Sequence, residues 1–580
     1  MGFGLPKQEA QERELSRRTA WTALLLLVLA GSGLRLWRIG QKELWLDECI
    51  SAIAARGTVA ETIGNVARED AHPAAYYGAL NLATRITGDD EAGLRLPSAV
   101  ASIGCIVLTY AIGAALLNRT AGLLAAAGMA VSSFQLYFAQ EARLHALVTL
   151  LVLALTYVFV RLLAGSGASL RAVWPWVVAY GALTALSVYT YYYAVFAVVA
   201  HAAVFLVLWG CSRASCGAAE NSGGGPRWVL RRCEAGNLAV LLFSAAMLGG
   251  VLFAVGWGRV VLDRLHAVGG TPAERIGLYN AADALRHYLT GPVADRMMLA
   301  AQRRGAGFPL AEHLIGLAVL PFVAALCASR RAPGAVVCLI LMVAVPFLCA
   351  AVLPARPHVF GPKHLVFVVP FVFLLLAAPA VGPRARLLAG AALLLLVPLN
   401  AFFDALYFDP AYHKEPWRAV AREIRRGARP GDVIVVTPGY AEHPLSRYLS
   451  SERIGRVVQA PFTGVNTVRD AARTRPPGVW LVQLSSDVAR PNREVGTWLA
   501  AWENPDLAVP DAREVSWTEW YPAEGALLQS GSVGILLAHW RGRRSGEQES
   551  VSMGPVFEGF TSGRTTITVR RFAPKRATGR

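Results

Sequence analysis

The chain has 580 residues, of which 54% are hydrophobic and only 16% are charged, and its mean hydropathy is +0.41. This composition excludes an ordinary soluble enzyme and predicts a polytopic membrane protein. The net charge of +17 does not indicate nucleic-acid binding, because many basic residues stand in short loops and tails beside apolar runs, as membrane orientation requires. The cysteines are scattered and match neither a zinc site nor a disulfide framework.

A membrane span needs about 20 mostly apolar residues, and about eleven segments qualify. They are residues 20–37, 97–117, 120–137, 144–164, 173–189, 191–209, 237–256, 311–328, 335–354, 364–380 and 387–404. We interpret the first as an uncleaved signal anchor, because further spans follow it. The odd number of spans predicts that the N-terminus and the C-terminal segment lie on opposite sides of the membrane.

Basic residues mark one set of connecting segments. They occur in "ERELSRR" before the first span and in the loops at 118–119, 211–233, 329–334 and 382–386. Basic short loops are typical of the cytoplasmic side, so residues 1–19 are predicted to be a cytoplasmic segment. The opposite loops, which contain acids, histidines and aromatic residues, are then extracytoplasmic.

One long outer segment, residues 257–310, has a helix-like apolar pattern in its second half, "ERIGLYNAADALRHYL". A helix lying there at the membrane surface would cover a site in the outer loops and exclude water. A plain structural cap explains the pattern equally well.

The composition changes near residue 405, which divides a membrane domain at 20–404 from a C-terminal domain at 405–580. "WRAVAREIRRG" predicts a helix, and "DVIVVTP" predicts the strand that follows it. "PPGVWLVQLSSD", "SVGILLAHW" and "TTITVRRF" predict further strands, with "REVGTWLAAWE" as a helix among them. We therefore expect a soluble extracytoplasmic α/β domain. Because no Gly-rich phosphate loop opens its helices, support or acceptor docking is its expected role.

Several motifs follow one another through the first two outer loops. They are Asp47 and Glu48 in "LWLDE"; His72, Pro73 and Tyr76 in "HPAAYY"; Arg95 to Ser98 in "RLPS"; and Gln140, Glu141 and Arg143 in "QEAR". This order resembles the bacterial branch of the protein O-mannosyltransferase-like enzymes, membrane glycosyltransferases of the C superfamily (GT-C) that take sugars from polyprenyl phosphates. The resemblance covers roughly residues 20–410. It implies a GT-C-like helical bundle joined to the soluble domain.

The chain departs from the pattern of that family at three places. Ala74 replaces the second proline of a His-Pro-Pro segment, and His145 stands where an aromatic residue is usual. Lys363 and His364 precede a late span where relatives often carry Arg-Tyr. These departures leave the implied reaction unchanged but weaken any inference about the sugar.

The chemistry of sugar transfer from a lipid phosphate agrees with these residues. The acceptor hydroxyl needs a base, and the departing phosphate needs cations. Asp47 and Glu48 form the expected catalytic pair. By resemblance Asp47 is the base, and Glu48 holds the loop or the acceptor. Without the surrounding motifs, two adjacent loop acids would be interpreted as solvated.

The remaining candidates are expected to bind the donor phosphate or the acceptor. They are His72, Glu141, Arg143, Lys363 and His364. Each has a simpler explanation: Glu141 and Arg143 as an interfacial ion pair, Lys363 and His364 as snorkelling cations, and His72 as an ordinary loop histidine. Tyr189 and Tyr191 to Tyr193 fit an aromatic belt better than a sugar-stacking surface.

No cofactor is expected to be required. Asp47, Glu48, His72 and Glu141 could supply ligands to a divalent metal, but the resemblance favours the metal-independent members of the superfamily. We therefore predict no metal site.

The sequence predicts a glycosyltransferase of the cytoplasmic membrane of a bacterium, with its active site and C-terminal domain outside. It would move a hexose or pentose from a polyprenyl-phosphate-linked donor to a hydroxyl of a protein, a lipid or a cell-wall glycan. The alternative is a transporter or flippase of a lipid-linked or soluble glycan. Transporters usually carry ionisable residues at mid-bilayer depth, whereas the acids here lie in outer loops.

Overall fold

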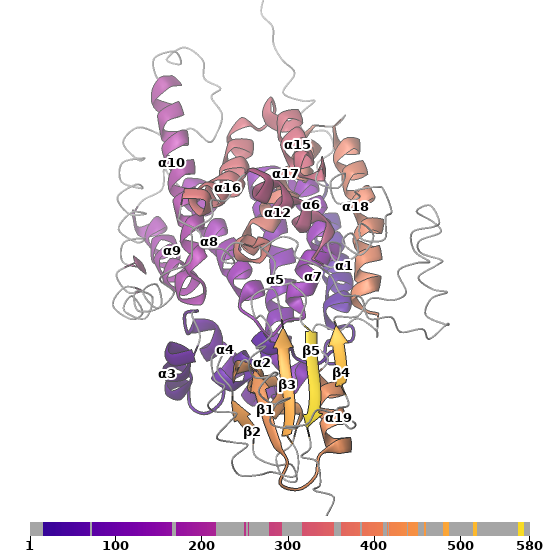
Figure 1. Cartoon of the computed structure of the whole chain (residues 1–580). Coiled ribbons are helices and arrows are strands. Elements are labelled where there is room, and N and C mark those ends of the chain that lie inside the picture. Colours follow the sequence, from indigo (N-terminus) through magenta and orange to yellow (C-terminus); the bar gives the residue numbers. More distant parts are fainter. Residues whose placement is uncertain are drawn as a thin grey trace, which may run out of the picture.

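The protein consists of a helical bundle and a five-stranded sheet that lies beyond one end of it (Figure 1). The computed structural model describes residues 15–69, 72–164, 170–215, 249–250, 253, 278–292, 316–352, 361–382, 385–409, 415, 417–437, 439–449, 457–459, 479–485, 514–518 and 566–572.

Within these residues, seven helical segments are long and apolar enough to cross a membrane. They are α1 (Arg17–Leu36), α5 (Glu91–Leu116), α8 (His145–Ala164), η1 with most of α10 (Tyr192–Gly210), α16 (Pro333–Val352), η3 with α17 and η4 (Pro362–Val381), and α18 from Ala389 to Tyr407. A bent pair of helices makes eight if it is one span. The prediction of a polytopic helical membrane protein is confirmed.

Three of the predicted spans are not among those seven or eight. Residues 173–189 lie in α9 (Leu170–Thr190), which does not meet the same length and hydropathy test. Residues 311–328 correspond to the short helix Gly316–Ser329. The predicted span 237–256 falls largely outside the described residues. The total of about eleven therefore stays a prediction.

The predicted span 120–137 is broken in two. α6 (Arg119–Val131) and α7 (Ser133–Ala139) are bent by 58°. Asn400 of α18 stabilises the break, because its Oδ1 accepts a hydrogen bond from the Ser133 N–H at 2.8 Å and its carbonyl accepts one from the Ser133 hydroxyl at 2.9 Å. The bend directs the residues that follow α7 toward the first outer loop.

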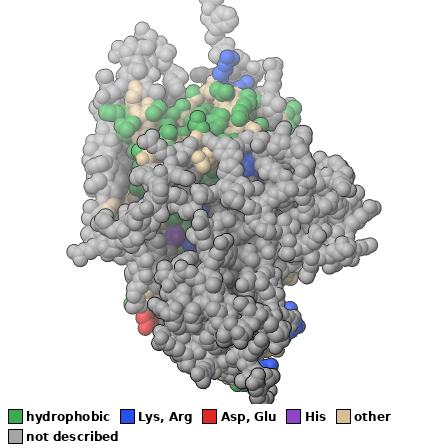
Figure 2. Space-filling view, viewed as in Figure 1, with side chains coloured by type: hydrophobic (Ala, Val, Ile, Leu, Met, Phe, Trp, Pro, Cys, Tyr) green, Lys and Arg blue, Asp and Glu red, His purple; other side chains and the backbone are tan. Residues whose placement is uncertain are grey.

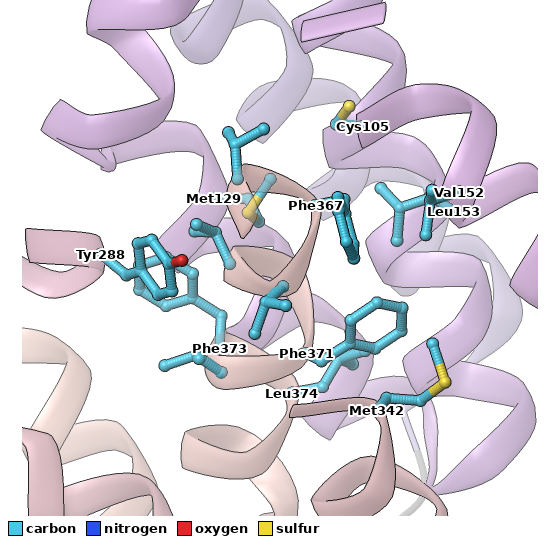
Figure 3. Close-up of a cluster of buried hydrophobic side chains, with 14 of the residues drawn as sticks. Cys105, Met129, Val152, Leu153, Tyr288, Met342, Phe367, Phe371, Phe373 and Leu374 are labelled. Carbon is cyan, nitrogen blue, oxygen red and sulfur yellow. The ribbon is translucent and has the colours of Figure 1, made fainter. Parts of the chain in front are cut away.

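Among the described spans, Pro362–Val381 is the most deeply buried, with 89% of its apolar stretch inside the protein. Figure 3 shows its Phe367, Phe371 and Leu374 among side chains of the surrounding helices. A helix that is hydrophobic all round belongs in the middle of a bundle. The first residues of this span, Lys363 and His364, are thereby held at a fixed place.

Basic loops gather at one end of the bundle. The Arg119 guanidinium donates to the Leu15 carbonyl at 2.9 Å, and Asn118 donates to the Ala380 carbonyl at 3.3 Å. Arg331 lies against Gly382. Figure 2 shows hydrophobic side chains gathered across the upper half of the molecule, with Lys or Arg side chains at its upper edge.

Three helices of the loop between α1 and α5 lie at the end of the bundle nearest the sheet (Figure 1). They are α2 (Leu46–Ala54), α3 (Val59–Glu69) and α4 (Ala75–Thr87). Thr58 and Glu61 form a capping box at the start of α3, with the Thr58 N–H donating to Glu61 Oε2 at 2.7 Å and the Glu61 N–H donating to Thr58 Oγ1 at 3.2 Å.

The C-terminal sheet has the strand order β2-β1-β3-β5-β4. Its strands are β1 (Val433–Thr437), β2 (Val457–Gln459), β3 (Val479–Ser485), β4 (Glu514–Thr518) and β5 (Thr566–Phe572). β1 pairs in parallel with β2 and β3, whereas β5 runs antiparallel between β3 and β4. Helices α19 (Trp417–Gly427) and α20 (Glu442–Tyr448) precede and follow β1. The predicted helix in "REVGTWLAAWE" and the strand in "SVGILLAHW" lie outside the described residues.

Candidate active site

Two adjacent acids at the start of α2 face different surroundings. Asp47 and Glu48 stand in the first turn of the helix, where exposed N–H groups favour negative charge. The Asp47 side chain is 26% exposed, whereas the Glu48 side chain is 0% exposed. Asp47 is therefore the acid that a substrate can reach.

Glu48 forms a buried ion pair with Arg95 of α5. The Arg95 Nε and Nη2 atoms each donate to one carboxylate oxygen at 2.7 Å. The N–H of Ala142, just after α7, donates to Glu48 Oε1 at 2.8 Å. This carboxylate joins α2 and α5 to the segment between α7 and α8.

The other N–H groups of Arg95 hold the loop between α1 and α2. Nη1 donates to the carbonyls of Ile39 at 3.0 Å and Lys42 at 2.8 Å, and Nη2 donates to the Glu43 carbonyl at 3.1 Å. Hydrogen bonds from a charged donor are among the stronger ones. One guanidinium thus fixes the chain that leads into Asp47.

Arg143 lies beside Asp47. Its Nη2 is 3.7 Å from Asp47 Oδ2, and its Nη1 donates to the Asp47 carbonyl at 3.3 Å and to the Tyr77 hydroxyl at 3.2 Å. The Arg143 side chain is 7% exposed. A cation is therefore held between α2 and α4, next to the accessible carboxylate.

Lys363 and His364 follow Pro362 at the start of η3 (Pro362–Val368), the first part of the central span. The Tyr288 hydroxyl of α12 (Leu278–Thr290) contacts the carbonyls of Pro362 at 3.1 Å and Leu365 at 3.2 Å. The Lys363 ammonium interacts electrostatically with Asp47, Arg143 and Glu141. A second cation is thus close to the same carboxylate.

Tyr191 joins three histidines. The His72 ring stacks on it with centroids 5.6 Å apart, the His145 ring meets it edge-on at 6.3 Å, and His364 Nδ1 is hydrogen-bonded to its hydroxyl. Burial, together with the neighbouring Tyr193, raises the pKa of Tyr191 well above the ordinary value. Its hydroxyl therefore stays protonated and can orient an imidazole.

Glu141 is buried near His145, with its Oε2 3.9 Å from His145 Nδ1 and a side-chain exposure of 1%. A carboxylate and an imidazole at this distance interact by charge only when the imidazole is protonated. Glu141 also interacts electrostatically with the Lys363 ammonium.

The structure brings six of the seven predicted site residues into one cluster. They are Asp47, His72, Glu141, Arg143, Lys363 and His364. Glu48 points instead into the bundle, toward Arg95. The sequence interpretation missed Tyr191, which had been assigned to the aromatic belt. The run "SVYTYYY" at the end of α9 was the available signal.

The residues that could serve as metal ligands do not form a metal-binding group within the described part of the chain. No three Asp, Glu, His or Cys side chains there lie close enough together to hold an ion. Glu48 is bound to Arg95, and the surroundings of Asp47 contain the cations Arg143 and Lys363.

Comparison with known families supports the resemblance. The family model described as dolichyl-phosphate-mannose-protein mannosyltransferase matches residues 71–216. This segment contains His72, Arg95, Glu141 and Arg143. The resemblance carried by the motifs is confirmed over this segment. No curated protein sequence matches the chain at a significant level.

Solved structures of membrane transferases are similar to the chain at low identity. The apo oligosaccharyltransferase of Archaeoglobus fulgidus is 12% identical with a TM-score of 0.49, over 96% of this chain and 89% of that one. ArnT from Cupriavidus metallidurans in the apo state is 13% identical with a TM-score of 0.47, over 95% and 98%. The S. cerevisiae protein O-mannosyltransferase complex bound to the sugar donor is 14% identical with a TM-score of 0.31, over 44% and 36%. Because these TM-scores are below 0.5, the structural similarity does not support a function. The family match and the geometry of the site do.

The buried ion pair predicts a large effect of Glu48→Gln. The substitution leaves the Arg95 charge buried without a counter-charge, which costs about 3–5 kcal/mol. We expect the unfolding temperature in detergent, followed by tryptophan fluorescence, to fall by several degrees. Asp47→Asn should leave that temperature nearly unchanged, because the Asp47 side chain is partly exposed. Equal unfolding temperatures for Glu48→Gln and the unmutated protein would contradict the anchoring role.

Proposed function

We propose that the protein is a membrane glycosyltransferase that moves a sugar from a polyprenyl-phosphate-linked donor to an acceptor hydroxyl. The observation that carries the proposal is an accessible carboxylate, Asp47, with the Arg143 guanidinium 3.7 Å away and the Lys363 ammonium in electrostatic interaction with it. The family match over residues 71–216 supports the same reaction. The donor sugar is a hexose or a pentose. The acceptor is a protein, a lipid or a cell-wall glycan.

Asp47 acts as the general base. The acceptor oxygen forms a bond to the anomeric carbon of the sugar, the bond from that carbon to the phosphate oxygen breaks, and the hydroxyl proton passes to Asp47. Because the acceptor attacks directly, the configuration at the anomeric carbon inverts. No general acid is needed, because the phosphate leaves as a stable anion with a second pKa near 6.

Arg143 and Lys363 hold the departing phosphate. Both cations are fixed before the reaction begins, Arg143 by Tyr77 and the α2 backbone and Lys363 by the central span. Preorganised charge stabilises the anion that develops as the bond breaks. His72 and His364, oriented by Tyr191, supply further contacts to the phosphate or the acceptor.

Glu48 is a positioning residue in this mechanism rather than a base. Its oxygens accept hydrogen bonds from Arg95 and from the Ala142 N–H. It keeps Asp47 of the first outer loop and Arg143 of the second at a fixed separation. Of the catalytic pair predicted from the sequence, Asp47 therefore reacts with the substrate, whereas Glu48 positions the loops.

We place the reaction at the outer face of the cytoplasmic membrane of a bacterium. The basic loops around Arg119 and Arg331 lie at one end of the bundle, which is typical of the cytoplasmic side. Helix α2, which carries Asp47, and the C-terminal sheet lie at the other end (Figure 1). The lipid tail of the donor then lies against the spans, while its phosphate reaches the cluster.

The proposed reaction does not require a metal ion, since Arg143 and Lys363 provide positive charge beside Asp47. We expect turnover to be the same, within about twofold, after treatment with EDTA; this margin is small against the several kcal/mol that a catalytic metal supplies. A loss of turnover that added Mg²⁺ or Mn²⁺ restores would contradict metal independence.

The function is tested by turnover in detergent with polyprenyl-phosphate mannose and polyprenyl-phosphate arabinose, using solubilised envelope material as the acceptor. Release of polyprenyl phosphate is measured. Because a general base contributes about 10²–10⁴-fold to the rate, Asp47→Asn should lower turnover by that factor. Asp89→Asn, which changes an exposed acid outside the cluster, is the matched control. Full turnover by Asp47→Asn would overturn the assignment of the base.

The phosphate contact is tested by binding of undecaprenyl phosphate, which carries no sugar. A charge-assisted contact contributes about 1.5–3 kcal/mol, so Lys363→Met should weaken binding by about 10- to 100-fold. Lys363→Arg should retain most of the affinity. Arg426→Met, at an exposed position of α19, controls for the lost charge. Unchanged affinity of Lys363→Met would show that Lys363 does not hold the phosphate.

A further inference from the structure

The C-terminal domain makes direct contacts with the loop that carries Asp47. The Leu46 N–H donates to Glu415 Oε2 at 2.8 Å, and the Leu44 N–H donates to the Tyr448 hydroxyl at 2.7 Å. The N–H of Arg418 donates to the Glu43 carboxylate. Three residues of the four at positions 43–46 are thus bonded to segments that belong to the soluble domain.

Glu415 is held in place by the core of that domain. The Trp417 Nε1–H donates to the same Glu415 oxygen at 2.6 Å, and Trp417 is 0% exposed. Trp417 packs in a core cluster with Val420 and Ile424 of α19. The Leu46 side chain packs against this cluster as well. The first residue of α2 therefore packs against the core of the soluble domain.

The contact completes the N-terminus of α2. A helix leaves its first N–H groups without partners inside the helix, and Trp45 at the N-cap offers no side-chain oxygen to accept from them. Glu48 Oε2 accepts from the Trp45 N–H at 3.4 Å, and Glu415 accepts from the next one. A carboxylate at this end also interacts favourably with the helix dipole.

We propose that Glu415 is a positioning residue for the transfer reaction, through which the C-terminal domain sets the place of Asp47. Asp47 follows Leu46 directly, so the hydrogen bond from Leu46 to Glu415 fixes the turn on which the base stands. Arg95 holds the same loop from the membrane side. The inference rests on the proposed function of Asp47. It gives the soluble domain a part in catalysis as well as in support.

Two substitutions of Glu415 distinguish the effect of its hydrogen bond from the effect of its charge. Glu415→Ala removes the acceptor for the Leu46 N–H, whereas Glu415→Gln keeps an oxygen at the same position. Because a displacement of about 1 Å can cost about 100-fold in rate, we expect Glu415→Ala to lower kcat by about 10- to 100-fold. KM for the donor should change less than about threefold, since the phosphate-binding cations are untouched. Glu415→Gln should recover most of kcat.

Hydrogen exchange measures the same contact without turnover. In the full-length protein in detergent, the peptide containing Leu46 should exchange at least about tenfold faster in Glu415→Ala, because its amide loses a buried partner. Glu415→Gln should exchange like the unmutated protein. Arg422→Ala, at an exposed position of the same domain, should change neither kcat nor exchange.

The outcomes distinguish this inference from the proposed function. Normal kcat for Glu415→Ala in a protein whose Asp47→Asn variant is inactive would overturn the positioning role alone. A lower kcat without faster exchange at Leu46 would overturn it too, as would a rise in KM with kcat unchanged. If the unmutated protein released no polyprenyl phosphate from either donor, the proposed function would fail and the positioning role with it.

Discussion

Glu48 and Arg95 form an ion pair closed off from solvent, between α2 and α5. A buried charge pair costs desolvation, and its removal in favour of apolar residues is often neutral or stabilising. Its contribution here is geometric. It connects α2, α5 and the segment after α7, and the remaining Arg95 donors gather the carbonyls of residues 39, 42 and 43.

Two other site residues, Asp47 and Arg143, depend directly on that connection. Asp47 is adjacent to Glu48 in the helix, and Arg143 follows the Ala142 N–H that Glu48 accepts. The third contributor, Lys363, comes from a span whose burial fixes its depth in the membrane. A lipid-linked donor arrives at a depth set by its own tail. A rigid cluster at a fixed depth in the membrane therefore suits a substrate whose reactive carbon is confined to a fixed depth.

Much of this arrangement can be predicted from the sequence, because the motifs lie in loops between apolar runs. Glu141, Arg143 and Lys363 stand near ends of apolar segments, and Asp47 and His72 lie in the loop after the first one, so the sequence predicts that all five share one face of the membrane. The resemblance assigned their chemistry. The family match confirmed that resemblance over residues 71–216.

Other features depend on partners far away in the chain. Residues 120–137 resemble one apolar span, and the break at Ser133 is stabilised by Asn400, which is 267 positions away. Asp47 and Glu48 have the same chemistry and adjacent positions, so their separate roles emerge only from the placement of Arg95. Tyr191 lies in an aromatic run that fits a membrane belt, and the three histidines around it come from other parts of the chain. Glu415 has no sequence signal at all, since its partner is a backbone N–H.

The central claim is that Asp47 faces the anomeric carbon of a lipid-linked sugar, and copurified lipid tests it most directly. Mass spectrometry would compare lipids retained by the unmutated protein and by Asp47→Asn. The account predicts that a glycosylated polyprenyl phosphate is enriched on Asp47→Asn, because this variant binds the donor without consuming it. The mass would also identify the class of sugar. Equal amounts on both proteins, or none on either, would contradict the role of Asp47, and a bound soluble solute in place of the lipid would favour a transporter.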